Sequence, residues 1–279
     1  MDLKITPLSD GLGAEATGVN LSKPLDVDMK ARLNAAFSEN AILVIREQDL
    51  LAPQLLEAVQ LFGEVFRQHN TRFSLRECPL IHYLSNQDHY ENGRRYIPGA
   101  GYLTDHSNDR TPPKATVLLA KQLPETGGDT QFVNMTRAYE DLPPVKKKRI
   151  DGRKAKHVYQ SKFSPRKLTG LTPEAKKHIP DFVMHPLVRT QPETGRKSLY
   201  VNPIRIEAIQ GLEEVETLEL LDALIDHATQ TKYQYRHKWH LNDLVIWDYR
   251  CLLHKANGDY DPRQTRYLYR VMLQGDAPY

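Results

Sequence analysis

Residues 232–247 read KYQYRHKWHLNDLVIW, and this stretch carries the strongest signal for the fold. Every second residue from Tyr233 to Trp239 is Tyr, His or Trp, and the residues between them are Gln, Arg and Lys. This period-two alternation is typical of a strand with one buried face. Leu241-Asn242-Asp243 then indicates a turn, and residues 244–247 are an apolar run short enough for a buried strand. The stretch therefore predicts two consecutive strands joined by a turn.

Further strands are predicted on both sides of this stretch. Residues 41–45 (AILVI) and 116–120 (TVLLA) are continuous apolar runs, and residues 267–273 form another candidate strand near the end of the chain. Apolar residues recur at helical spacing over Met29–Glu39 and Glu213–Thr229, and Pro53–Phe62 is a third expected helix, because proline is tolerated in a first turn.

The order of these elements is not the strand–helix alternation of a parallel sheet. Short strands fill the middle and the end, while helices cluster early and around residues 213–229. We therefore expect a mainly β protein with peripheral helices, built as an antiparallel double sheet of the jelly-roll type.

Length and composition are those of an ordinary globular protein. The chain has 279 residues, 40% hydrophobic and 26% charged, and a net charge of +3, which is too small to favour nucleic acid or a membrane surface as a partner. No aromatic residues interleave with the basic run Lys146–Arg149, so we interpret it as a solvated helix end or loop. Two cysteines and no apolar stretch of 18 residues lead us to expect a soluble cytoplasmic protein, with Cys251 a buried inert thiol.

Two segments contain the residues that could carry chemistry. Tyr102-Leu103-Thr104-Asp105 is the first, and His254, 149 positions after Asp105, ends the second, Trp247–His254. Taken alone, an Asp before a turn is usually a turn residue. A His after an apolar run is likewise more often a core residue than a metal ligand, so only the wider context can raise these two above that reading.

That context is an ordered series of motifs along the chain. The series comprises Gly13–Gly18, Tyr102–Asp105, Thr111–Ala115, Leu123–Thr130, His185–Thr190, Tyr200–Asn202, Trp247–His254, Asn257–Tyr260 and Arg266–Arg270. In order and spacing it resembles the taurine dioxygenase family of Fe(II)/2-oxoglutarate-dependent oxygenases, from about residue 3 to residue 275. The single motifs are weak, whereas the ordered set is specific.

The resemblance implies both a fold and an activity. The fold would be a double-stranded β-helix (jelly roll) forming a single domain over residues 1–279. The activity would be hydroxylation of a small anionic molecule by a dioxygenase that uses Fe(II), 2-oxoglutarate and O2 and releases succinate and CO2. Its partner would be that small-molecule substrate, without nucleic acid or membrane, and the chain would form a homo-oligomer as family members often do.

The resemblance also assigns roles residue by residue. Asp105 and His254 would bind iron and act as the catalytic residues. Arg266 would form a two-pronged ion pair with the distal carboxylate of 2-oxoglutarate, for which a guanidinium is well shaped, and Thr130 would donate its hydroxyl to the same group. For the substrate, the implied contacts are Arg270, His69 and Tyr102, with core packing as the alternative for Tyr102 and a surface position as the alternative for His69.

Three positions depart from the family pattern. Leu103 stands where the family has the first His ligand, Gln191 replaces a usual His, and Tyr249 replaces a usual Asn. The iron site of such oxygenases uses two imidazoles and one carboxylate on one face of the metal. Leu offers no lone pair, so Asp105 and His254 alone would hold Fe(II) more weakly and leave an additional open position.

Three hypotheses follow from Leu103. In the first, the chain is an engineered or mutated oxygenase. In the second, His106 supplies the missing donor, which requires it to turn inward because adjacent strand residues point to opposite faces. In the third, the chain is a non-catalytic protein that binds 2-oxoglutarate or another small molecule on the same scaffold.

Overall fold

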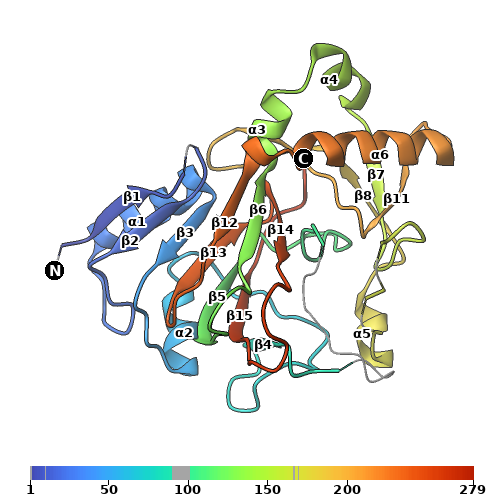
Figure 1. Ribbon diagram of the computed structural model, residues 1–279. Helices are drawn as coiled ribbons and strands as arrows, with labels where there is room; N and C mark the ends of the chain where they lie inside the picture. Colours follow the sequence, from blue (N-terminus) through green and yellow to red (C-terminus); the bar gives the residue numbers. More distant parts are fainter. Residues whose placement is uncertain (1, 10, 90–100, 166, 169) are drawn as a thin grey trace.

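The main sheet runs through the centre of the molecule (Figure 1). A computed structural model describes residues 2–9, 11–89, 101–165, 167–168 and 170–279. The strand order is β1-β2-β3-β13-β5-β15-β4, and only the β2–β3 pair is parallel. The strands are β1 (Lys4–Pro7), β2 (Ala14–Thr17), β3 (Ile42–Ile45), β4 (His82–Ser85), β5 (Ala115–Gln122), β13 (Leu244–Asp248) and β15 (Tyr267–Leu273).

A smaller antiparallel sheet packs against one face of the main sheet. Its order is β12-β6-β14, with β6 (Thr130–Asn134), β12 (Gln234–His237) and β14 (Leu252–Ala256). Two further small sheets have the orders β10-β9 and β11-β7-β8. Their strands are β7 (Lys154–His157), β8 (Val183–Pro186), β9 (Val188–Thr190), β10 (Lys197–Leu199) and β11 (Ile206–Ile209).

The helices lie around this pair of sheets (Figure 1). They are α1 (Val27–Asn40), α2 (Ala52–Val59), α3 (Met135–Glu140), α4 (Pro144–Ile150), α5 (Pro173–His178), α6 (Glu214–Ala228) and the 3₁₀ turn η1 (Thr231–Tyr233). In α1 the Asp26 side chain accepts a hydrogen bond from the Met29 N–H and begins the helix, and Ala41, at φ 62°, ends it. No helix in the described part of the chain has the length and apolar character needed to span a bilayer.

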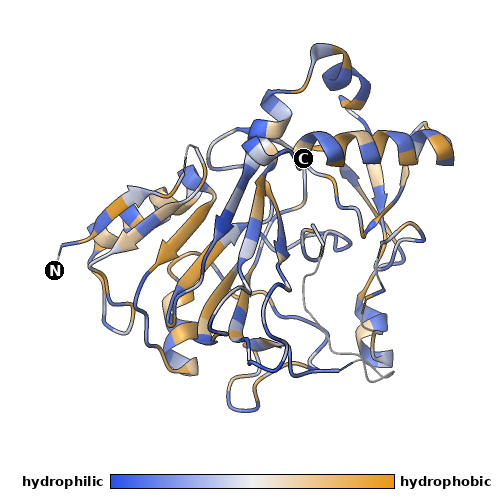
Figure 2. Cartoon of the chain, in the orientation of Figure 1, coloured by the Kyte–Doolittle hydropathy of each residue, from blue (hydrophilic) through white to orange (hydrophobic). Residues whose placement is uncertain are grey.

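Successive side chains of a strand point to opposite faces of the sheet, so the strands contribute to separate hydrophobic cores on their two faces. Leu43 and Ile45 of β3 face the core under α1 and α2, whereas Ile42 and Val44 face the core between the two sheets. A strand buried on both faces reads as a continuous apolar run, which is why residues 42–45 do so, and β3 is coloured hydrophobic along its length in Figure 2. A third core joins the outer face of the second sheet to α3 and α6.

The two sheets meet at an aromatic contact. The ring of Phe132 on β6 lies 5.2 Å, centroid to centroid, from that of Trp247 on β13, in an edge-on arrangement. This packing of a large sheet on a small one, with helices outside, confirms the predicted jelly roll.

Most predicted elements are present, with shifted ends. The strand predicted over residues 232–239 is only Gln234–His237, because residues 231–233 form η1. Burial alternates as predicted from Tyr235 to Trp239, but Gln234 is half-buried like Tyr235. The turn at Asn242 is confirmed, with that residue in the left-handed region at φ 65°. The expected helix at 53–62 stops at Val59, and residues 60–62 continue as a turn.

Candidate active site

A cavity of about 160 Å³ is lined by residues from both sheets. The main sheet contributes side chains from β4, β5 and β15, and the smaller sheet contributes side chains from β6 and β14. The charged and polar lining includes Asp105, His254, Thr130, Arg266 and Arg270, which are five of the residues that the sequence singled out. Only the pairing of distant strands brings these positions together.

Leu103 lies directly beside His254. The two residues exchange backbone hydrogen bonds, with N–O distances of 3.0 and 2.9 Å, as an isolated antiparallel bridge. Residues paired in this way place their side chains on the same face, and both side chains line the cavity. The position where the family has its first His is therefore next to the second His, but it holds a buried leucine that is 3% exposed.

Asp105 is surrounded by hydrogen-bond donors and positive charge. Its Oδ2 lies 3.9 Å from His254 Nε2 and 3.8 Å from Arg270 Nη1, and it accepts a hydrogen bond of 2.7 Å from the Tyr249 hydroxyl. Burial alone would raise the pKa of Asp105, but His254, Arg270, His106 and the Tyr249 hydroxyl together hold it well below its usual value. The side chain is thus a carboxylate, the form that a metal requires.

Arg266 is the most informative buried charge in the cavity. The residue is 5% exposed, and burial lowers the pKa of its guanidinium to about 10. Its Nε donates to the Gly128 carbonyl over 2.8 Å, and its Nη2 lies 3.5 Å from Thr130 Oγ1. Among the described residues, no carboxylate lies within 4 Å of this guanidinium. A buried cation of this kind calls for an anionic ligand.

Local sequence explains how Arg266 is held. Gly127 and Gly128 both have positive φ, 76° and 72°, and a side chain at Gly127 would come within 2.4 Å of the Asp259 carbonyl oxygen. The two glycines therefore allow the chain to pass close to residue 259 and to present a carbonyl to Arg266. Thr130 follows at the start of β6, where its hydroxyl accepts from Trp239 Nε1 over 3.0 Å, so that its own proton can be donated.

Arg270 also faces Asp105, with its Nη1 3.8 Å from Asp105 Oδ2. Its Nη2 donates to Gln68 Oε1 over 2.7 Å, and it is paired across the sheet with His82. Burial, with the charge of Arg270, lowers the pKa of His82 to about 3, so this imidazole is neutral. Sequence reasoning singled out neither Gln68 nor His82. Adjacency to His69 was a signal for the first, and the second is placed only by the β4–β15 register.

His69 and Tyr102 occupy different surroundings. The His69 ring stacks on His178 of α5, with centroids 4.6 Å apart and planes at 7°, at the edge of the cavity. Tyr102 is not among the residues that line the cavity; it packs against the core under α6, with Lys255 Nζ 4.6 Å from its ring. The structure thus places Tyr102 in the packing role that was its alternative.

His106 lines the cavity from a turn rather than a strand. It adopts the left-handed conformation at φ 53°, and its Nδ1 lies 3.2 Å from Asp109 Oδ2. The objection that neighbouring strand residues face opposite ways does not apply at this turn. However, one of its two ring nitrogens is already directed at Asp109.

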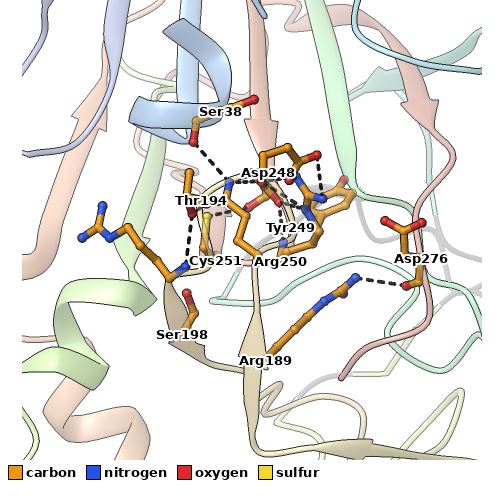
Figure 3. Close-up of polar contacts among 12 residues, drawn as sticks. Ser38, Arg189, Thr194, Ser198, Asp248, Tyr249, Arg250, Cys251 and Asp276 are labelled. Atoms are coloured by element: carbon orange, nitrogen blue, oxygen red, sulfur yellow. Dashed lines mark hydrogen bonds and ion pairs between the residues drawn. The ribbon is translucent and has the colours of Figure 1, made fainter. Parts of the chain in front are cut away.

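Gln191 and Arg250 both bind Asp248, which precedes the segment that leads to His254. Figure 3 shows Arg250 beside Asp248. The Arg250 guanidinium pairs with Asp248, Nη2 to Oδ2 2.8 Å, and with Glu193. Gln191 Nε2 donates to the same Asp248 oxygen over 2.8 Å. Burial opposes the ionised form of Asp248, but Arg250 and Gln191 keep its pKa below the usual value. The Gln191 amide therefore donates to Asp248 the kind of hydrogen bond that an imidazole N–H could donate.

The residues present fit 2-oxoglutarate better than they fit Fe(II). The paired Arg266 and Thr130 match a carboxylate of 2-oxoglutarate, because a buried guanidinium there has no carboxylate partner within the described chain. For Fe(II), Asp105 and His254 supply two donors that face each other, and Leu103 supplies none. In the described part of the chain no three His, Cys, Asp or Glu side chains form a metal-binding group.

Comparison with known proteins bears on the family of the chain as a whole. Residues 4–272 match the family described as "Taurine catabolism dioxygenase TauD, TfdA family". The (S)-phenoxypropionate/alpha-ketoglutarate-dioxygenase of Sphingobium herbicidovorans is 33% identical over 280 residues, covering 98% of this chain and 95% of that protein.

Solved structures superpose over almost the whole chain. A taurine dioxygenase from Burkholderia xenovorans has a TM-score of 0.84 at 32% identity, covering 99% of this chain and 90% of that one. The structure of AAD-2 in complex with Mn(II) and N-oxalylglycine has a TM-score of 0.83 at 29% identity, covering 100% and 99%. This chain therefore belongs to the TauD/TfdA family of 2-oxoglutarate-dependent dioxygenases.

Proposed function

We propose that this chain is an Fe(II)- and 2-oxoglutarate-dependent dioxygenase in which Arg266 and Thr130 bind 2-oxoglutarate, Asp105 and His254 bind the metal, and Arg270 recognises a small anionic substrate. The observation that carries the proposal is the convergence of Asp105, His254 and Arg266 on one cavity. A shared ligand accounts for the meeting of a carboxylate, an imidazole and a guanidinium that has no carboxylate within 4 Å among the described residues.

The 2-oxoglutarate end of the cavity is the better defined. The Arg266 guanidinium is fixed by its bond to the Gly128 carbonyl, so its remaining N–H groups can meet the two oxygens of a carboxylate. The Thr130 hydroxyl adds a donor on the same side. An incoming dicarboxylate would bring a negative charge to a guanidinium that Asp129 stabilises only from a distance, which favours binding of a dianion over a neutral molecule.

Arg270 is the residue that would bind the substrate anion. Its side chain is 17% exposed, and it lies between Asp105 and Gln68 while facing the cavity. Since Asp105 would share its charge with a metal, Arg270 would then be available to a substrate anion. The relatives support this class, because phenoxypropionate carries a carboxylate and taurine carries a sulfonate.

The protein's own contribution is binding, orientation and exclusion of water. When bound, Fe(II) would supply the activation of O2 coupled to decarboxylation of 2-oxoglutarate. Asp105 stays ionised and is oriented by the Tyr249 hydroxyl, while His254 is held by its backbone bridge to Leu103. Apolar side chains such as Leu118 and Ile204 complete the wall and keep water from the reacting substrate.

A non-catalytic binding protein is the alternative, and the comparisons do not favour it, because relatives of full length are named as dioxygenases.

The cytoplasm remains the proposed location, supported by the two cysteines, which are buried free thiols. Assembly into a homo-oligomer also remains a prediction.

The test is anaerobic addition of Fe(II) and 2-oxoglutarate, read by the visible charge-transfer band of their chelate. This chain is measured beside Leu103→His and Arg266→Met. We expect a weak band in the unchanged chain, a stronger band in Leu103→His, and none in Arg266→Met at the same concentrations. A band that is absent from all three proteins would refute the assignment of this site.

A further inference from the structure

We propose that Tyr249 replaces the missing imidazole, so that its phenol oxygen is the third protein donor to the metal beside Asp105 and His254. This inference rests on the proposed function, since it concerns the same metal position. It would make the site a His-carboxylate-phenol set in place of the family's two imidazoles and one carboxylate.

Two departures from the family pattern meet at one carboxylate. Leu103 removes a donor next to His254, and Tyr249 adds an oxygen 2.7 Å from Asp105 Oδ2. An asparagine, the usual residue at position 249, has a side chain several ångströms shorter than tyrosine. The site thus loses a nitrogen donor beside His254 at position 103 and gains an oxygen donor beside Asp105 at position 249.

The distances suit donors that share one cation. Two atoms each about 2.1 Å from a metal lie about 3 Å apart when their bonds are at right angles and about 4.2 Å apart when they are opposed. Asp105 Oδ2 and His254 Nε2 are 3.9 Å apart, and Asp105 Oδ2 and the Tyr249 oxygen are 2.7 Å apart. All three side chains line the same cavity.

Tyr249 is held rigidly in this position. The residue is 1% exposed, and its ring packs 6.2 Å from Trp247 and 5.6 Å from His254, centroid to centroid. Its backbone N–H donates to the Lys114 carbonyl over 2.8 Å, and its carbonyl accepts from Thr104 Oγ1 over 3.2 Å. Burial and the charge of Asp105 raise the pKa of the Tyr249 hydroxyl well above its usual value, so the group is a neutral phenol that would donate to a metal through an oxygen lone pair. Tyrosine is an established iron ligand in proteins.

His106 is the competing donor and provides a matched control. It also lines the cavity, but its Nδ1 is directed at Asp109 and its ring packs against Phe66, 5.6 Å away. If His106 were the third ligand, its removal would weaken metal binding and removal of the Tyr249 hydroxyl would not.

The experiment measures Mn(II) affinity by electron paramagnetic resonance in the full chain and in Tyr249→Phe, His106→Gln, Leu103→His and Leu103→His/Tyr249→Phe. We expect Tyr249→Phe to weaken binding at least about tenfold and His106→Gln to change it less than about threefold, by comparison with ligand-sphere variants in general. In the Leu103→His background, where an imidazole is restored, Tyr249→Phe should cost less than about threefold. The double variant also shows whether Phe is tolerated at position 249.

A second readout identifies the donor atom. Ferric iron added as its citrate complex should give a visible band whose resonance Raman spectrum contains tyrosinate ring modes, absent from Tyr249→Phe and present in His106→Gln. Unchanged Mn(II) affinity in Tyr249→Phe, or a ferric spectrum without tyrosinate modes, would overturn the inference. If the Fe(II)–2-oxoglutarate band still forms in that case, the proposed function stands and only the role of Tyr249 fails.

Discussion

Replacing Arg266 with methionine should separate ligand binding from folding. The guanidinium is buried and has no carboxylate within 4 Å among the described residues, and its pKa falls from 12.5 to about 10. A shift of that size corresponds to roughly 3 kcal/mol of unfavourable burial of the charged form. Methionine would remove this cost but leave the Gly128 carbonyl without its partner, which costs about 1–2 kcal/mol. We expect the free energy of unfolding to rise by about 1–2 kcal/mol.

Ligand binding should change in the opposite direction. Removing one partner of a buried, hydrogen-bonded charge pair costs about 2–5 kcal/mol, so 2-oxoglutarate affinity should fall by a factor of roughly 30 or more. The assays are urea unfolding of the protein alone and calorimetric titration with 2-oxoglutarate in the presence of Mn(II).

Arg250→Met is the matched control. Arg250 is equally buried but pairs with Asp248 and Glu193, so its removal leaves Asp248 without its main partner and should destabilise the fold by about 3–5 kcal/mol. If Arg266→Met were destabilised as much as Arg250→Met, or if it bound 2-oxoglutarate as the unchanged chain does, Arg266 would be a structural residue and the reasoning would be refuted.

Three further outcomes are expected. Leu103→His should tighten Fe(II) binding at least about tenfold, because even residues that only hydrogen-bond to a metal ligand change affinity about 10–100-fold. Equal affinity of the two proteins in an anaerobic Fe(II) titration would count against Asp105 and His254 as the metal site. His82, with a folded pKa of about 3 and an unfolded pKa near 6.5, contributes stability that is present above pH 6.5 and lost as the pH falls toward 3. His82→Gln should therefore flatten the slope of stability against pH in acid by about 1.4 kcal/mol per unit, measured by urea unfolding from pH 7 to pH 4; an unchanged slope would show that His82 is protonated in the fold. Gln191→Leu removes a donor from Asp248 and should lower the free energy of unfolding by about 1–3 kcal/mol, measured by urea unfolding at pH 7, whereas no loss would mean that Arg250 alone satisfies the carboxylate.

Local patterns predicted the strands well, because burial alternates along a strand with a fixed period. Residues 42–45 and 116–120 lie in strands and are buried on both faces, as their continuous apolar character indicated, whereas Ala41 ends α1 and lies outside the strand. Both ends of the predicted 232–239 strand were wrong: the strand stops at His237, and at its start a 3₁₀ turn places Tyr233 in the core as well as a strand would. Burial periodicity alone could not distinguish the two.

The candidate site could be predicted only through ordered motifs, not through spacing. Asp105 and His254 meet because β14 pairs with residue 103, and His82 meets Arg270 because β4 pairs with β15. Both pairings join segments far apart in the chain, so no local pattern specifies them. Tyr102 is instructive in the same way: its motif suggested the pocket, but its side chain packs toward the core under α6.

The most direct test of the account is a crystal structure of this chain with Mn(II) and N-oxalylglycine, an unreactive analogue of 2-oxoglutarate. We expect one carboxylate of the analogue to lie on the Arg266 guanidinium, within hydrogen-bond distance of Thr130, and the metal to lie between Asp105 and His254. An analogue bound away from Arg266, or a cavity that takes up the analogue while Asp105 stays bonded only to Tyr249 and Arg270, would contradict it.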